Sequence, residues 1–169
     1  PLFPYPPLFR SLILIFSPLH GTGAVLGETS LTCSGFSNFT MVAEQAAPDP
    51  EFSTVKKPNP EDAAAFDLAI KHGKKEDADL LIAVDPDADR LGAAVRQPSG
   101  GYQLLTGNQI AAIMLDYILT ARKNAGTLPV NAAAVKSIVS SEFATAIDKS
   151  YNVEMINVLT GFKFIAEQI

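Results

Sequence analysis

Cysteine is almost absent from this chain, whose 169 residues include only Cys33. A lone cysteine cannot form an intramolecular disulfide, and it cannot supply the several thiolates of a metal cluster. This cysteine usage fits a reducing compartment, so we expect a cytoplasmic protein. We expect Cys33 itself to be a small, buried, apolar side chain.

Long hydrophobic runs are also missing. The apolar run near the N-terminus, Leu12–Phe16, has five residues. A secretory signal needs roughly 7 to 15 apolar residues, and a membrane span needs about 20. We therefore expect no membrane segment, and we expect Leu12–Phe16 to be a buried strand behind an atypical, proline-rich segment at residues 1–11.

The chain has no excess of basic residues. It carries 13 Lys and Arg against 18 Asp and Glu, a net charge of -5 with a pI near 4.9. Nucleic acids and anionic membranes offer no cations to this excess of carboxylates, so neither is an expected partner. A local cation site is a better expectation.

Short apolar runs alternate with helical patterns, which is typical of an α/β protein whose strands end in functional loops. The expected strands are Leu12–Phe16, Thr40–Ala43, Leu80–Val84, Leu91–Val95, Tyr102–Leu105, Val135–Val139 and Val153–Leu159. One expected helix starts after Asn59, its N-cap, and buries Phe66, Ala69 and Ile70. The other expected helices cover about 23–34, a segment from 110, and the ranges 142–149 and 161–169.

A change of domain is expected near residues 124–131, where Gly126 and Pro129 stop a helix. Apolar residues at 110, 113, 114, 117 and 118 give that helix one apolar side. A second series of strands and helices follows, with too few strands to close a core by residue 169. We therefore expect the full-length protein to continue.

The clearest chemistry lies in the segment Asp85-Pro86-Asp87-Ala88-Asp89-Arg90, which follows the apolar run Leu80–Val84. Carboxylates at positions i, i+2 and i+4 of a tight loop can converge on one point, where their repulsion is costly without a cation. The spacing therefore predicts a site for a hard divalent cation, with Asp85, Asp87 and Asp89 as ligands.

Other Asp-rich loops fit this segment less well. An EF-hand needs Gly at its sixth position and Glu at its twelfth, where this chain has Arg90 and Arg96. Short Asp-Pro segments can simply make turns. A phosphatase with Asp85 as nucleophile and Asp87 as acid is a second enzyme hypothesis, although Asp89 is unusual in such a site.

The segment Leu80–Gly92 resembles the metal loop of the α-D-phosphohexomutases, the phosphoglucomutase and phosphomannomutase family. The resemblance extends in the same order over residues 12–169. It is carried further by Pro18–Gly23, Pro58–Glu61, Leu105–Gln109 and Leu159–Ile165. Family loops often have Gly between the aspartates, whereas Pro86 and Ala88 stiffen this loop without removing a ligand.

The resemblance implies part of a four-domain enzyme. Residues 12–125 resemble the second domain, a three-layer α/β/α unit with a mixed sheet, and residues 128–169 resemble the first part of the third, a partial second copy. The implied reaction moves a phosphoryl group between C1 and C6 of a hexose phosphate, through a hexose bisphosphate and an active-site phosphoserine.

The resemblance also implies roles for particular residues. The three aspartates would bind Mg²⁺, and Arg90 would stabilise the phosphoryl group in transfer. Thr160 and Gly161, at the start of a helix, and Lys163 would contact the substrate. The glycines around His20 suit close approach to a phosphate, and His20 could line the active cleft or hold its own turn together.

No segment resembles the family's serine loop, its Glu-rich sugar-selecting loop or its phosphate-binding fourth domain. We therefore expect the remaining domains of the same enzyme to be partners of this chain, and we expect the chain alone to be inactive. A non-catalytic metal-binding module is the alternative outside the enzymes. The His-Gly-Thr-Gly and Thr-Gly-Asn-Gln segments favour phosphoglucomutase over phosphomannomutase.

Overall fold

The computed structural model describes residues 11–169, so the segment predicted at residues 1–11 lies almost entirely outside the described residues. The chain forms two compact units, which meet in the sequence at Gly107 and Asn108. No helix within residues 11–169 combines the length and apolar character that a membrane crossing requires.

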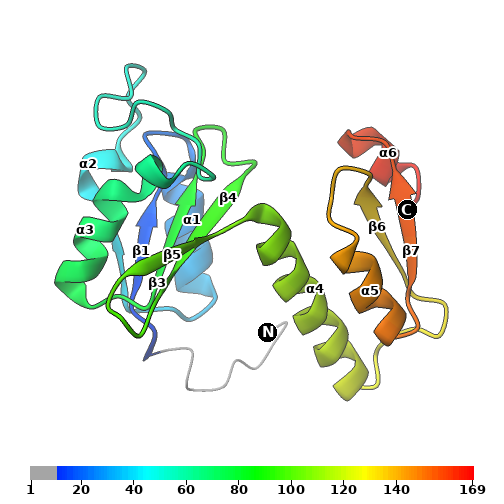
Figure 1. Ribbon diagram of the computed structural model, residues 1–169. Helices are drawn as coiled ribbons and strands as arrows, with labels where there is room; N and C mark the ends of the chain where they lie inside the picture. The colour runs from blue at the N-terminus through cyan, green and yellow to red at the C-terminus, as the bar shows by residue number, and fades with distance from the viewer. Residues whose placement is uncertain (1–10) are drawn as a thin grey trace. The chain divides into compact units, whose positions relative to one another are not determined.

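The first unit is built on a mixed sheet with the strand order β2-β1-β3-β4-β5 (Figure 1). Strands β2, β1 and β3 are parallel, and β4 and β5 continue the sheet in antiparallel pairing. The predicted α/β class is confirmed. The strands are β1 (Leu14–Ser17), β2 (Phe39–Met41), β3 (Leu80–Val84), β4 (Leu91–Arg96) and β5 (Tyr102–Leu105). The helices are α1 (Gly23–Cys33), α2 (Ala43–Ala46), the 3₁₀ helix η2 (Ala63–Phe66) and α3 (Asp67–Glu76).

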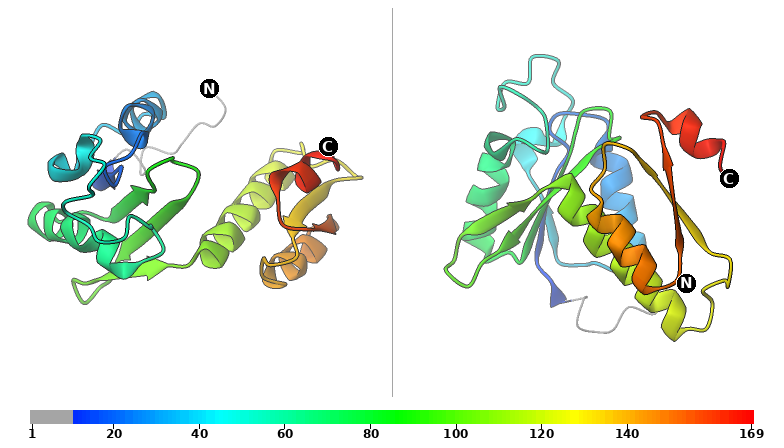
Figure 2. Two further views of the ribbon diagram at one scale, coloured as in Figure 1. Left: turned by 90° about the horizontal axis from the view of Figure 1, so that it is seen from above. Right: turned by 45° about the vertical axis from the view of Figure 1, so that its right-hand side comes forward.

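Helices α1 and α3 cover opposite faces of this sheet, which makes three layers (Figure 2). Phe16 is in register with Ile82, so Leu81 points to the other face. Helix α1 packs on the Phe16 face, because a Cβ at Gly27 would lie 2.3 Å from the Phe16 ring. Helix α3 packs over Leu81, where a Cβ at Gly73 would lie 2.7 Å from Leu81 Cδ2.

Helix α1 buries little of its own surface. Gly23 is its one fully buried residue, whereas Val25 and Leu26 are 72% and 70% exposed. The helix approaches the sheet through glycines, not through an apolar stripe. Cys33 at its end is exposed, so the predicted burial of this cysteine is wrong.

The helical segment before β3 begins later than predicted. The side chain that caps it belongs to Asp62, at the start of η2, and not to Asn59. The carbonyl of Pro60 packs against β4, so closely that a Cβ at Gly92 would lie 2.2 Å from its oxygen. This contact holds the backbone at residue 60 against the sheet, and the helical turns start beyond it. The predicted burial of Phe66 is confirmed.

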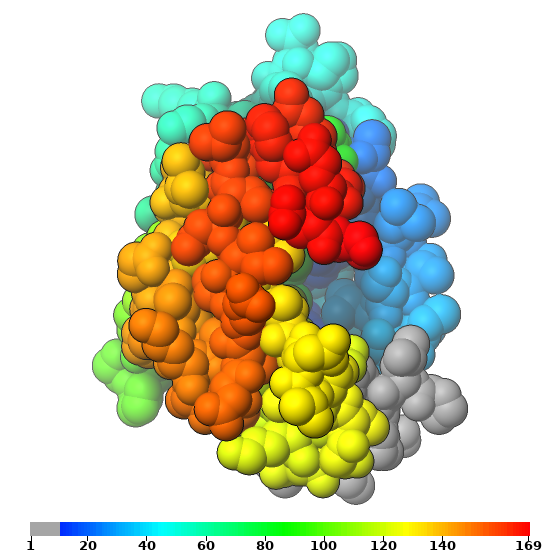
Figure 3. Space-filling model, turned by 90° about the vertical axis from the view of Figure 1, so that its right-hand side faces the viewer, coloured from blue at the N-terminus to red at the C-terminus, as the bar shows by residue number. Residues whose placement is uncertain are grey.

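The second unit has one pair of parallel strands and three helices. Part of its surface, including β7 and α6, is visible in Figure 3. Its helix α6 ends at Ala166, three residues before the predicted end at Ile169. The elements are α4 (Gly107–Asn124), β6 (Ala133–Ser137), α5 (Phe143–Ser150), β7 (Glu154–Val158) and α6 (Phe162–Ala166).

Helix α4 belongs to the second unit. Its side chains Ala112 and Leu119 pack with Ile147 and Val153 in that unit's core. The compact units therefore divide one helix earlier than the predicted boundary at residues 124–131.

The apolar side predicted for α4 exists, but it is not the side that this core uses. Ile113, Met114, Tyr117 and Ile118 are between 41% and 59% exposed. A helix with apolar residues on two sides gives a periodic signal that does not say which side a core will cover.

Asp148 is a buried carboxylate without compensation in the second unit. It lies on α5 with no exposed surface, and neither carboxylate oxygen has a hydrogen-bond partner among the described residues. Burial raises the pKa of this carboxyl above its usual range. The neutral form is thus favoured by folding, and ionisation opposes it.

Replacing Asp148→Leu should therefore stabilise the second unit at neutral pH. The pKa of Asp148 is higher in the folded protein than in the unfolded one. Its contribution to stability is therefore fully present below the unfolded pKa and is lost as pH rises through the folded pKa. The expected gain is about 1–3 kcal/mol near pH 7, narrowing toward pH 4. Thermal unfolding followed by circular dichroism at several pH values measures it.

The matched control is Glu167→Leu, which changes an exposed acid of the same unit. It should leave the free energy of unfolding nearly unchanged at every pH. A loss of stability in Asp148→Leu at pH 7 would contradict the argument.

Candidate metal centre

The acidic loop is the connection of an antiparallel strand pair. β3 ends at Val84 and β4 begins at Leu91, and these two residues are paired across the ladder. Residues 85–90 therefore leave and re-enter the sheet at one point. The apolar side chains of β3 anchor the loop, as the sequence predicted.

Asp85 is the buried base of this loop, with no exposed surface. One of its carboxylate oxygens accepts the backbone N–H of Arg90 at 2.9 Å, and the other accepts Arg90 Nε at 2.7 Å. Burial opposes ionisation, but the hydrogen bonds from Arg90 outweigh it and hold the pKa of Asp85 below its usual range. The carboxylate is therefore charged and fixed in orientation.

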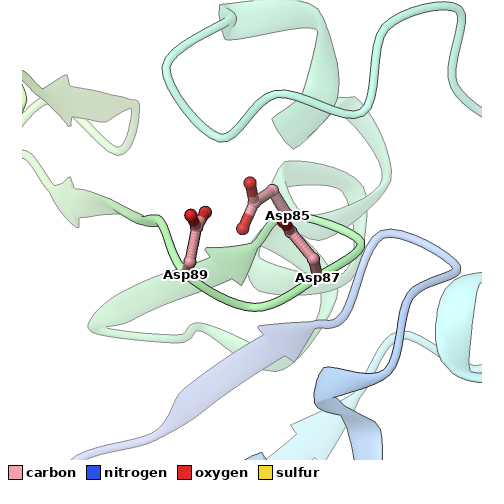
Figure 4. A group of neighbouring side chains, drawn as sticks. All are labelled: Asp85, Asp87 and Asp89. Atoms are coloured by element: carbon pink, nitrogen blue, oxygen red, sulfur yellow. The ribbon is translucent and has the colours of Figure 1, made fainter. Parts of the chain in front are cut away.

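Asp87 and Asp89 rise from the same loop and are exposed (Figure 4). Asp85, Asp87 and Asp89 can each offer an oxygen such that all three oxygens lie within 4.8 Å of one another. The charge of Asp87 raises the pKa of Asp89 most, and partial desolvation and the charge of Asp85 raise it further. Convergent hard oxygen donors that repel one another fit a hard divalent cation.

Arg90 adds a positive charge at the edge of this cluster. Its Nε lies 3.7 Å from an Asp89 oxygen, and its side chain is 55% exposed. Its hydrogen bonds to Asp85 use the backbone N–H and Nε, so the exposed end of the guanidinium can meet the oxygens of an anionic ligand. The arrangement places a candidate cation site beside a group that can bind an anion.

The same geometry argues against Asp85 as a phosphatase nucleophile. A nucleophilic carboxylate needs an oxygen that can reach a phosphorus atom. Both oxygens of Asp85 accept hydrogen bonds from Arg90 and lie inside the fold, so a phosphorus atom with its four substituents cannot approach them. A small cation between Asp87 and Asp89 can still meet a remaining lone pair of one of these oxygens.

His20 lies in the turn before α1 and is 6% exposed. Its Nδ1 lies 3.1 Å from the carbonyl oxygen of Ala47, and its Nε2 lies 2.7 Å from Thr54 Oγ1. Both ring nitrogens are thus used within the fold. These bonds fit a support of its turn, and contact of His20 with a substrate stays a prediction.

The other predicted substrate contacts lie in the second unit. Thr160 and Gly161 are exposed, and Gly161 is the N-cap of α6 with φ of 134°. Lys163 is exposed, with its Nζ 4.7 Å from the centre of the Phe164 ring. These residues are accessible, and their contact with a substrate stays a prediction.

Sequence reasoning did not identify the support of the loop by the turn between β1 and α1. The backbone N–H of Thr22 donates to the carbonyl oxygen of Pro86 at 2.8 Å, and its Oγ1 donates to the same oxygen at 3.1 Å. The glycines at 21 and 23 were the available signal, since glycine permits close backbone approach.

Two family profiles match this chain. "Phosphoglucomutase/phosphomannomutase, alpha/beta/alpha domain II" matches residues 9–100, and the profile of domain III matches residues 106–169. The chain belongs to the phosphoglucomutase/phosphomannomutase family. The two matches meet near Gly107, where the compact units also divide.

Curated relatives of this family are close in sequence. The phosphoglucomutase of Staphylococcus aureus strain USA300 is 43% identical over 158 residues, and that of strain N315 is 42% identical over the same length. Each alignment covers 94% of this chain but 28% of the relative. The chain thus spans little more than a quarter of the length of these relatives.

Solved structures show the same fold. A phosphoglucomutase/phosphomannomutase family protein from Burkholderia thailandensis matches with a TM-score of 0.72 at 18% identity, over 93% of this chain and 31% of that one. Aspergillus fumigatus N-acetylphosphoglucosamine mutase, in complex with GlcNAc-6P and magnesium, matches with a TM-score of 0.64 at 15% identity, over 94% and 32%.

The repulsion within the loop gives a test in the metal-free protein. Asp89→Asn should raise the melting temperature at low ionic strength, because it removes a charge that the other two carboxylates repel. The gain should shrink as salt screens these exposed charges. Calorimetry in EDTA at two salt concentrations measures it, and Glu51→Gln, an exposed acid outside the loop, is the control. A lower melting temperature in Asp89→Asn would count against the repulsion.

Proposed function

We propose that this chain supplies the Mg²⁺-binding part of a phosphoglucomutase that interconverts hexose 1-phosphate and hexose 6-phosphate in the cytoplasm. The observation that carries the proposal is the convergence of Asp85, Asp87 and Asp89 on one point beside Arg90. The names of the curated relatives favour glucose phosphates as substrates. The complex of the Aspergillus relative with magnesium supports the choice of ion.

The chain's own residues have distinct tasks in this proposal. Asp85, Asp87 and Asp89 hold the cation, which when bound neutralises charge on the oxygens of a phosphoryl group. Arg90 directs its exposed guanidinium at the same group and stabilises the charge that spreads over its oxygens during transfer. The apolar β3 strand keeps these groups at fixed positions, so little reorganisation is needed.

The second unit contributes to substrate binding. Gly161 is the N-cap of α6, and the exposed backbone around Thr160 and Gly161 can donate to a sugar hydroxyl or a phosphate oxygen. Lys163 adds a positive charge nearby in the sequence. The serine that carries the phosphoryl group, and further contacts to the hexose bisphosphate intermediate, belong to the remaining domains of the same enzyme.

Binding of Mg²⁺ to the purified chain tests the site directly. Isothermal titration calorimetry should detect binding by the unmodified protein, and Asp87→Asn should weaken it at least about tenfold, since it removes a ligand. The control Asp67→Asn, at the start of α3, makes the same chemical change outside the loop. Equal affinities in all three proteins would refute the metal site.

The 169-residue chain should show no mutase turnover by itself, because no segment of it resembles the family's serine loop. The assay supplies glucose 1-phosphate, a catalytic amount of glucose 1,6-bisphosphate and Mg²⁺, and it follows glucose 6-phosphate. Phosphate release is followed in parallel and should also be absent, because Asp85 is not available as a nucleophile. The Staphylococcus aureus enzyme is the positive control. Conversion above background would contradict the assignment of the serine to another domain.

A further inference from the structure

The loop of residues 85–90 and the turn between β1 and α1 pack tightly against each other. Beyond the two hydrogen bonds from Thr22 to Pro86, a Cβ at Gly21 would lie 2.2 Å from Pro86 Cα. A Cβ at Gly23 would lie 2.6 Å from Val84 Cγ2 and 3.4 Å from Ala88 Cβ. A displacement of this turn must therefore move the loop.

The turn itself is in a conformation that its sequence does not favour. Leu19 and His20 are consecutive residues with φ of 44° and 62°. L-residues with side chains rarely adopt this left-handed region, and two in succession need support from the surrounding structure. Leu19 is fully buried and His20 nearly so, which supplies part of that support.

A continuous chain of hydrogen bonds supplies the rest. Leu19 N–H donates to Ser17 Oγ at 3.1 Å, and Ser17 Oγ donates to Gln45 Oε1 at 2.6 Å. Gln45 Nε2 then donates to Thr54 Oγ1 at 3.1 Å, and Thr54 Oγ1 lies 2.7 Å from His20 Nε2. This series of hydrogen bonds thus begins at Leu19 and ends at His20, the two residues with positive φ.

The donor and acceptor of each hydrogen bond made by His20 and Thr54 follow from the groups involved. A carbonyl oxygen only accepts, so His20 Nδ1 must carry the proton that it shares with Ala47 O. In neutral His20 the Nε2 atom then accepts, and the Thr54 hydroxyl donates to it. Thr54 Oγ1 remains free to accept from Gln45, so each bond of the chain has one donor and one acceptor.

We propose that Ser17, Gln45, Thr54 and His20 form a brace that holds the turn of residues 18–23 against the metal loop and thereby sets the loop's affinity for Mg²⁺. His20 and Thr54 are positioning residues and do not touch the ion. The inference rests on the proposed metal site and adds a determinant of its affinity that lies outside the loop. Ser17, Gln45 and His20 are buried, and the exposed Thr54 completes their hydrogen bonds at the surface. A partly satisfied buried network is costly, so loss of the Thr54 hydroxyl should affect the whole turn.

Thr54→Val tests the brace, because it keeps the shape of the side chain and removes the hydroxyl on which two bonds depend. Titration calorimetry should show Mg²⁺ affinity reduced about tenfold, the size expected when a support of a metal site is lost. Thr54→Ser, which restores the hydroxyl, should bind as the unmodified protein does. Thr29→Val is the matched control, because the Thr29 hydroxyl donates to Val25 O within α1, away from the turn.

Amide NMR signals of Ala88 and Arg90 give a second reading that needs no metal. They should shift in Thr54→Val and stay in place in Thr54→Ser and Thr29→Val. Unchanged affinity and unchanged signals in Thr54→Val would overturn the brace while leaving the metal site intact. If the unmodified protein does not bind Mg²⁺, the proposed function fails. The NMR signals of the loop in Thr54→Val then still decide whether the brace positions the loop: shifted signals support it and unshifted signals refute it.

A cooperative thermal melt must accompany each measurement. Should Thr54→Val lack one, Gly21→Ala is compared with Gly101→Ala, whose added Cβ meets nothing within 4 Å. Gly21→Ala must push the turn from Pro86, so weaker Mg²⁺ binding and shifted loop signals are expected. Wild-type behaviour of Gly21→Ala would show that the turn does not position the loop.

Discussion

The pairing of Asp85 with Arg90 is the constraint on which the site depends. Asp85 is the first residue after β3 and Arg90 the last before β4, and two hydrogen bonds join them across the mouth of the loop. An uncompensated buried carboxylate would be costly, so this pair also allows the apolar strand to end in an acid. With the mouth closed, the intervening residues can only project outward.

That closure creates the repulsion on which cation binding relies. Asp87 and Asp89 are brought near Asp85, and the raised pKa of Asp89 records the resulting electrostatic cost. Arg90 relieves part of it through its contacts with Asp85 and Asp89. The rest is relieved by an added cation, so the same feature that weakens the metal-free loop favours the metal-bound one. Binding sites are often less stable than their scaffold for this reason.

The sequence predicted well whatever depends on neighbouring residues. The apolar run of β3 and the spacing of the three aspartates are local signals, and both lie where expected. Packing between distant segments was not predicted. Helix α4 has two apolar sides, and only its tertiary neighbours decide that Ala112 and Leu119 enter a core while Ile113 and Tyr117 stay exposed. His20 was equally open, because the Ala47 and Thr54 atoms that it contacts lie 27 and 34 residues away.

Coordination chemistry explains why such a loop suits an enzyme divided among domains. Mg²⁺ takes about six oxygen ligands in octahedral geometry and usually keeps positions for water or phosphate. In the proposed site one oxygen from each aspartate would fill three positions, and the other positions would be left for water or a phosphoryl oxygen. A loop that supplied all six ligands would leave no position for a phosphoryl oxygen, so the incomplete ligand set is a requirement of the proposed chemistry.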